Sequence, residues 1–180
     1  GKIATKVDAK NQKIVYSYDS YGRLALIQRG SVATGSFVKD TCQQEKYYYD
    51  TNPFDSSYSH YSAGRMTAVQ YYGPNPTYPS SPSNPSPYAN PGSGCGTTYT
   101  EMYDYNQPGA RVGKRLRITR WVQFGGGASV QTTNSSTDLN ATFTYDSESK
   151  LTGLAYPNSG PNLGYSYDSM GRLNTMTDVG

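Results

Sequence analysis

Apolar and polar residues alternate along much of this chain, in short runs that are separated by polar turns. Residues 163–167 carry one Leu and two Tyr at every second position, and residues 173–177 resume the alternation after a turn. A period of two indicates a strand with one side toward a core and the other toward water. The pattern therefore predicts an all-β protein: an antiparallel sheet of consecutive hairpins, with long irregular insertions and no helix longer than a turn or two.

The turn between those two runs has a signature of its own, Tyr-Asp-x-x-Gly-Arg-Leu, at residues 167–173. Asp168 suits the start of a turn because its carboxylate can accept a hydrogen bond from a backbone N–H two residues further on. Gly171 suits the position that requires positive φ, and Arg172 restarts the strand. We expect turns of this kind at residues 19–22, 146–149 and 168–171, with positive φ at Gly22 and Gly171.

The same frame recurs along the chain, which indicates a repeat array rather than one isolated hairpin. Its members are Tyr18-Asp19 with Gly22-Arg23, Tyr49-Asp50, Tyr105, Tyr145-Asp146, and Tyr167-Asp168 with Gly171-Arg172. The turn after Tyr49-Asp50 closes only at Gly64-Arg65, and the turn after Tyr105 contains one extra residue. We interpret residues 1–180 as a single repeat domain with insertions at about 28–46, 51–63, 73–96 and 125–140.

With this frame the chain resembles the YD-repeat (Rhs-repeat) family, most strongly at residues 1–27 and 141–180. The resemblance implies a long, curling antiparallel sheet. In larger members of the family such a sheet winds into a hollow shell around a toxin or forms part of a cell-surface adhesion protein. It therefore implies a structural role for this chain.

Residues 1–8 lie in the same frame as residues 171–178, so we expect an open sheet edge at each end. The unpaired N–H and C=O groups of an open edge pair readily with a further strand. Two sources of that strand remain: other copies of the chain, joined head to tail in a fibre, or flanking repeats of a longer array. The chain begins with Gly1 rather than Met, which indicates a processed product, an excised fragment or an engineered chain.

Composition supports a sheet whose packed layer is largely tyrosine, since the 180 residues include 19 Tyr. The formal net charge is only +3, so we expect no nucleic-acid partner. No run of residues approaches the length of an apolar membrane span. The expected function is a structural β scaffold at the cell surface or outside the cell.

Cys42 and Cys95 are the only cysteines, and each lies shortly upstream of a Tyr-initiated turn. If the repeats stack, both lie near the same edge of the sheet, and we predict a disulfide between them, with free buried thiols as the alternative. Two Cys and one His are too few for a metal site. His60 lies in a polar loop without the partners of a catalytic triad, so we expect no enzymatic activity and no cofactor.

Sugar chemistry gives the alternative function, a carbohydrate-binding or adhesion module. Trp121, Tyr78 and Tyr88 are candidate stacking platforms, together with Tyr71 and Tyr72. The basic strand with Arg115, Arg117 and Arg120 beside Trp121 could contact sugar or nucleic acid, or its arginines pair with Asp, Glu or Tyr across the sheet. Asn134 and Asn140 fit the N-glycosylation sequon, within what we interpret as a polar turn from Asn134 to Asn140.

Overall fold

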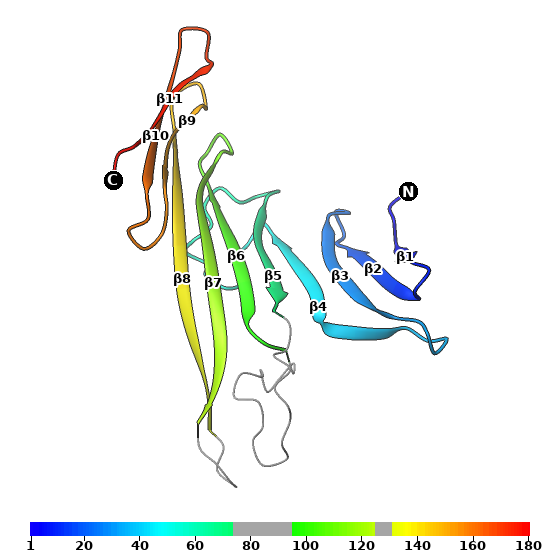
Figure 1. Cartoon of the computed structure of the whole chain (residues 1–180). Helices are drawn as coiled ribbons and strands as arrows, with labels where there is room; N and C mark the ends of the chain where they lie inside the picture. The colour runs from blue at the N-terminus through cyan, green and yellow to red at the C-terminus, as the bar shows by residue number, and fades with distance from the viewer. Residues whose placement is uncertain (74–94, 125–130) are drawn as a thin grey trace. The chain divides into compact units, whose positions relative to one another are not determined.

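The structure, a computed structural model, describes residues 1–73, 95–124 and 131–180, and for residues 121–124 and 131–133 it describes the backbone alone (Figure 1). Eleven strands form one open antiparallel sheet, in which each strand lies beside its neighbours in the sequence. The described residues contain no helix. The predicted all-β, antiparallel class is therefore confirmed.

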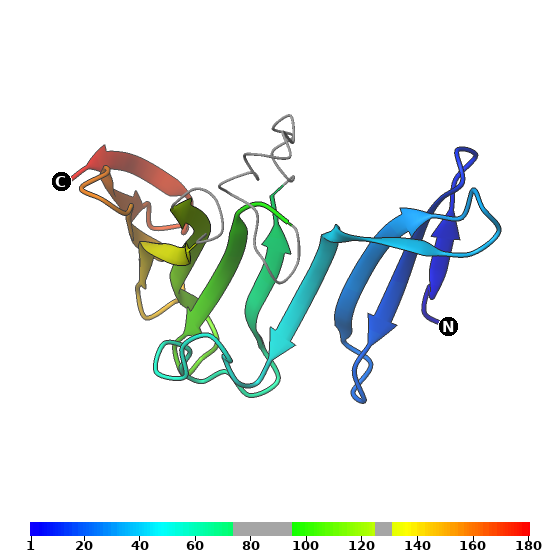
Figure 2. The same cartoon turned by 90° about the horizontal axis from the view of Figure 1, so that it is seen from below.

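The strands follow one another in chain order across the sheet, as Figures 1 and 2 show. In chain order they are β1 Thr5–Val7, β2 Gln12–Tyr18, β3 Leu24–Ser31, β4 Val38–Tyr49, β5 Met66–Tyr72, β6 Thr98–Tyr105, β7 Arg111–Phe124, β8 Gln131–Tyr145, β9 Leu151–Ala155, β10 Asn162–Tyr167 and β11 Leu173–Asp178.

By their contacts the residues fall into two compact units. The first comprises Gly1–Tyr48, Val69–Thr100 and Arg117–Thr137, and the second comprises Tyr49–Ala68, Glu101–Leu116 and Asp138–Gly180. Strands β4 to β8 contribute residues to both units.

In the first unit, β3 and β4 pair through a region that we expected to be an insertion, residues 28–46. Gln28 pairs with Gln44, but the next residue, Arg29, pairs with Asp40. The three residues between them, 41–43, are extra on β4 and form a wide irregularity in the ladder. The expectation of a loop was wrong over most of this range, because strand pairing can absorb additional residues as a bulge.

A second difference concerns residues 134–140, which we interpreted as a polar turn within an insertion at 125–140. They lie inside the long strand β8, which begins at Gln131. The side-chain oxygens of Thr119 and Ser136 lie 2.9 Å apart across β7 and β8. Hydroxyl pairs of this kind allow a polar sequence to form a strand, and the sequence pattern did not reveal them.

Most buried residues of the second unit lie on β5 and β6. Thr67, Ala68 and Met102 are fully buried, and Tyr103 and Tyr105 are nearly so. Thr67 and Ala68 are consecutive, so both sides of the sheet are covered at this point. In β11 of the same unit every residue is exposed.

Candidate functional site: a ladder of tyrosine-aspartate turns

The turn at Asp19 shows the hydrogen bonds that define the repeat. The Asp19 N–H donates to the Arg23 carbonyl, and the Gly22 N–H donates to the Asp19 carbonyl, both at 2.9 Å. The Asp19 carboxylate accepts from the N–H groups of Tyr21 and Arg23 at 3.0 and 2.7 Å. The same four bonds recur at Asp8, Asp146 and Asp168.

Positive φ falls at the fourth position of each turn. Gly22 and Gly171 have φ of 77° and 76°, which confirms the prediction for both residues. Asn11 and Ser149 hold the same position with φ of 59° and 64°. Asn tolerates this conformation better than most residues, whereas Ser149 takes it without the freedom of glycine.

The turn after Tyr105 corrects one of our interpretations. The Asn106 N–H donates to the Ala110 carbonyl, and the Gly109 N–H donates to the Asn106 carbonyl, both at 3.0 Å. This spacing equals that of the turn at Asp19, so the turn contains no extra residue. Ala110 occupies the position that Arg23 has in the turn at Asp19. The arginine comes one residue later, as Arg111, and this suggested a longer turn.

The turn after Asp50 closes where the sequence predicted. The Asp50 N–H donates to the Arg65 carbonyl at 3.0 Å, and the Gly64 N–H donates to the Asp50 carboxylate at 2.6 Å. Residues 51–63 are therefore an insertion inside one repeat turn.

That insertion lies against β6 and β7. The Ser59 hydroxyl donates to the Tyr103 carbonyl at 2.8 Å, and the His60 N–H donates to the Asp104 carboxylate at 2.7 Å. The Arg115 guanidinium donates to the Asp55 carboxylate at 2.7 Å and lies 4.2 Å from the centre of the Tyr58 ring. These contacts attach the middle of the insertion to the sheet.

In several repeats the tyrosine just before the turn donates to a backbone carbonyl at or just before the start of the neighbouring strand. The Tyr105 hydroxyl donates to the Met66 carbonyl at 2.8 Å, and Met66 is the first residue of β5. Equivalent bonds, at 2.8 to 2.9 Å, join Tyr18 to Ile3, Tyr145 to Arg111, and Tyr167 to Leu151. We call this bond the tyrosine latch. The regular place of the tyrosine was visible in the sequence, but its acceptor, a backbone carbonyl, was not.

A cation accompanies the latches of Tyr105, Tyr167 and Tyr18. Arg65 lies over the Tyr105 ring, Lys150 over the Tyr167 ring and Lys2 over the Tyr18 ring, with the charged group 5.1 to 5.7 Å from the ring centre. Each cation is the residue just before the carbonyl that accepts the latch. Cation–π attraction thus adds to the tyrosine hydrogen bond between successive turns.

The carboxylates of Asp19 and Asp168 are held in the charged form, because the pKa of each is lowered. At Asp168 the pKa lies below its ordinary value, chiefly because the Arg172 backbone N–H and guanidinium donate to the carboxylate. At Asp19, desolvation opposes the effect of Arg23, and the pKa is still lowered. The carboxylate of each of these aspartates is therefore used in hydrogen bonds within its own turn.

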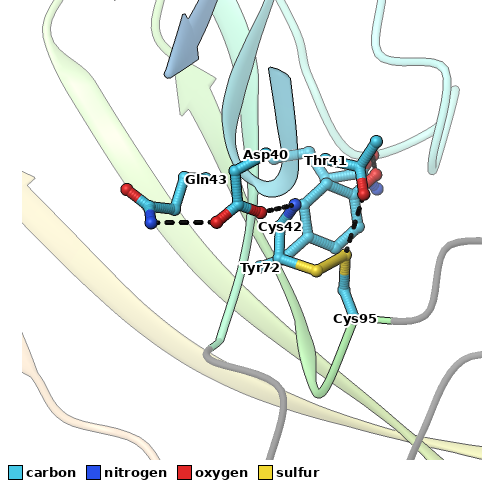
Figure 3. Close-up of a disulfide and its surroundings, with 7 residues drawn as sticks. Asp40, Thr41, Cys42, Gln43, Tyr72 and Cys95 are labelled. Carbon is cyan, nitrogen blue, oxygen red and sulfur yellow. Dashed lines mark hydrogen bonds between the residues drawn. A yellow bond between two sulfur atoms is a disulfide. The ribbon is translucent and has the colours of Figure 1, made fainter. Parts of the chain in front are cut away.

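The predicted disulfide between Cys42 and Cys95 is confirmed, with a Cα–Cα distance of 5.2 Å (Figure 3). Cys42 lies in the bulge of β4, where the Asp40 carboxylate accepts from the Cys42 N–H at 2.9 Å. Cys95 is fully buried. A cavity of about 670 Å³ lies beside the bond, lined by residues that include Arg29, Asp40, Glu45, Tyr71 and Tyr72.

Several of the remaining candidates lie outside the described part of the chain, and the others are on β7 and β8. Tyr78 and Tyr88 lie outside the described residues, as does the side chain of Trp121. Asn134 and Asn140 are exposed on β8, and the Asn140 amide oxygen accepts a hydrogen bond from Arg115 at 2.7 Å. Arg115 also contacts Asp55 and Asp138, so pairing with acids accounts for it.

Two features are absent from the described part of the chain, a cluster of metal ligands and a membrane-spanning helix. Its residues contain no group of three or more His, Cys, Asp or Glu placed to hold a metal ion. Across the same ranges, no helix has the length and apolar character needed to cross a membrane.

No family model matches the chain, and no curated protein matches it. A chain in the crystal structure of TcdB2-TccC3-TEV is similar to it, with 13% sequence identity and a TM-score of 0.25, over 94% of this chain and 10% of that chain. The chain thus spans about a tenth of the length of that protein. Function is therefore inferred below from the residues of the chain itself.

Proposed function

We propose that this chain is a structural β scaffold of the YD-repeat kind, located outside the cell or at its surface. Its open strand edges pair with further strands, supplied by other copies of the chain in a fibre or by flanking repeats of a longer array. The observation that carries the proposal is the tyrosine latch, which recurs between turns and has a backbone carbonyl as its acceptor. Such a bond fixes one hairpin to the next.

The outer side of β11 is suited to strand addition. The Val179 N–H donates to the Asn162 carbonyl on β10 at 2.6 Å, which makes this pair a hydrogen-bonded one. Hydrogen-bonded and non-bonded pairs alternate in an antiparallel ladder. Thr175 and Thr177 therefore form hydrogen bonds with β10, whereas the N–H of Met176, between them, points away from β10. Pairing with a new strand would satisfy these outward groups.

An extracellular location is supported by the Cys42–Cys95 disulfide, because such bonds persist in oxidising compartments. Asn134 and Asn140 are exposed on β8, where a sugar chain could be attached.

The proposal is tested by sedimentation velocity over a range of concentrations, with negative-stain electron microscopy of the same samples. Assembly from copies predicts species that grow with concentration. Met176→Pro removes the outward N–H of β11 and should stop the growth, whereas Met176→Ala keeps that N–H and should not. Circular dichroism shows whether both variants keep their strands.

Extension by flanking repeats predicts a different result. The isolated chain then stays monomeric, but its β11 edge binds a peptide of residues 12–23, which contains β2 and its turn. A chain that neither grows with concentration nor binds this peptide contradicts the scaffold function.

A second candidate, saccharide binding, is favoured by the cavity beside the disulfide. It combines the aromatic side chains of Tyr71 and Tyr72 with the planar polar groups of Arg29, Asp40 and Glu45. Aromatic faces with fixed hydrogen-bonding groups suit a sugar ring and its hydroxyls. A glycan array tests this function: specific binding that is lost in Tyr72→Ala supports it, and an array without binding contradicts it.

A further inference from the structure

Strands β1 and β11 occupy the same place in the repeat. Just before β1, the Ile3 carbonyl accepts the tyrosine latch from Tyr18, and the Ala4 carbonyl accepts a hydrogen bond from the Tyr16 N–H at 2.9 Å. Lys2 lies over the Tyr18 ring. In the frame that aligns residues 1–8 with 171–178, the segment Lys2-Ile3-Ala4 corresponds to Arg172-Leu173-Asn174.

The two strands differ in length and in what they contact. β1 has three residues and β11 has six, and every residue of both is exposed. Among the described residues, no tyrosine hydroxyl contacts the Leu173 carbonyl. The Arg172 side chain is 74% exposed, whereas Arg23, at the same position of its own turn, is 24% exposed. The start of β11 thus has the groups that accept a latch. The segment before β1 already accepts one, but the strand that follows it is shorter.

We propose that β11 of one copy displaces β1 of a second copy and pairs with β2 of that second copy. The inference rests on the proposed function and specifies how copies join head to tail. The Leu173 carbonyl then accepts the latch from Tyr18 of the second copy, in place of Ile3. Arg172 replaces Lys2 over the Tyr18 ring, as Arg65 lies over Tyr105 within the chain.

Displacement also satisfies the direction of the strands. All neighbours in the sheet are antiparallel, so β1 and β11, both odd in the order, run the same way. Direct pairing of β11 with β1 of a second copy is antiparallel only if that copy presents its opposite face. Pairing with β2 is antiparallel and keeps the same face, so the repeat continues without interruption.

The register follows from the pairing of β1 with β2. Thr5 pairs with Val15, and Val7 pairs with Lys13. Because Ala4 and Tyr16 are hydrogen-bonded, Thr5 and Val15 form a non-bonded pair, whose side chains lie closest together. In the joined copies Thr175 takes the place of Thr5 opposite Val15.

Cysteine cross-linking tests that register. The double variant Thr175→Cys with Val15→Cys should form disulfide-linked dimers and higher species on mild oxidation, seen on a non-reducing gel. The control Thr177→Cys with Val15→Cys places the second thiol on the same face but two residues out of register, and it should link at least about tenfold less. Equal linkage of both pairs, or none, overturns the inference.

Deletion of residues 1–7 separates displacement from edge-to-edge contact. Removing β1 frees β2 from an intramolecular competitor, so assembly should begin at a concentration lower by roughly tenfold or more. Contact between β11 and an intact β1 predicts the opposite, a loss of assembly.

Two substitutions examine the cation. Arg172→Gln should weaken assembly about threefold, because the cation–π contact with Tyr18 is lost. Arg172→Lys should restore it, since Lys2 and Lys150 serve at the same position within the chain. Assembly that survives only with β1 present overturns displacement but leaves the scaffold function standing. A chain that remains monomeric with and without residues 1–7, and binds no peptide of residues 12–23, overturns both.

Discussion

The parts of β5 and β6 that belong to the second unit are far more buried than β11 of the same unit. Met102 on β6 is fully buried, whereas Met176 on β11 is 60% exposed. Both strands adjoin Tyr-initiated turns with the same hydrogen bonds. The repeat therefore explains the sheet in both places, but it does not explain the core.

The difference coincides with the insertion at residues 51–63. This segment contacts β6 through Ser59 and His60, and it contacts β7 through the pairing of Asp55 with Arg115. Asn52, within it, is itself buried and donates to Ser59 at 3.1 Å. We conclude that the repeats build a sheet with open sides and edges, and that an insertion supplies the cover that makes a core.

Removing the insertion at residues 51–63 should have the largest effect on stability. Replacing residues 51–63 with two residues would restore a tight turn between Asp50 and Gly64, like that at Asp19. The sheet should persist, but the free energy of unfolding should fall by about 3 kcal/mol or more, since several large side chains at β6 become exposed. Urea unfolding followed by circular dichroism measures the loss. An unchanged midpoint would show that the insertion is not the cover.

A matched pair of methionine substitutions compares the buried strand β6 with the exposed strand β11. Met102→Ala should lower the free energy of unfolding by about 2–4 kcal/mol, because it leaves a cavity among buried side chains. Met176→Ala should change it by less than about 0.5 kcal/mol in the dilute monomer, because this side chain is exposed. Equal effects, measured by urea unfolding at low concentration, would contradict the assignment of the core to β6.

The turns should respond alike wherever they lie, because their geometry is shared. Gly171→Val should cost about 1–2 kcal/mol, since a β-branched residue is strained at a φ of 76°. Ser149→Gly should stabilise the protein by roughly 0.5 kcal/mol, because glycine adopts positive φ without strain. Thermal unfolding compares the two variants. Stabilisation by Gly171→Val would mean that the turn is misassigned.

Much of this architecture was predictable, because its determinants are local. The hydrogen bonds of Asp19 and Asp168 stay within five residues, and the positive φ of Gly22 and Gly171 is fixed by the turn itself. The frame also predicted the closure of the long turn at Gly64-Arg65. The disulfide followed from two cysteines at similar places in the repeat.

The remainder depended on contacts between distant residues. Nothing in the sequence around Ser59 indicates that its hydroxyl reaches the Tyr103 carbonyl. The bulge of β4 and the polar strand β8 likewise depend on what the neighbouring strand offers. The tyrosine latch was hidden for the same reason, since its acceptor is backbone that any residue provides.

The smallest expected effect concerns pH and the insertion. Burial raises the pKa of Tyr58 to about 12, and the nearby Arg115 only partly offsets this. Because the pKa of this tyrosine is higher in the folded state, its contribution to the stability of the protein is lost as pH rises. The loss begins near pH 10, about the pKa of the unfolded state, and continues through the folded pKa. The free energy of unfolding should therefore decline over this window, and less steeply in Tyr58→Phe. Identical slopes in both proteins would contradict the burial of Tyr58 against β7.

Amide hydrogen exchange, resolved by residue, tests most directly whether β11 is an open edge made for a further strand. In dilute solution the account predicts slow exchange at Met102, through global unfolding alone, and fast exchange at Met176, whose N–H points away from β10. When the chain assembles, or when a peptide of residues 12–23 is added, Met176 should become protected while Met102 stays unchanged. Strong protection of Met176 in the dilute monomer, or no change on assembly and peptide addition, would contradict the account.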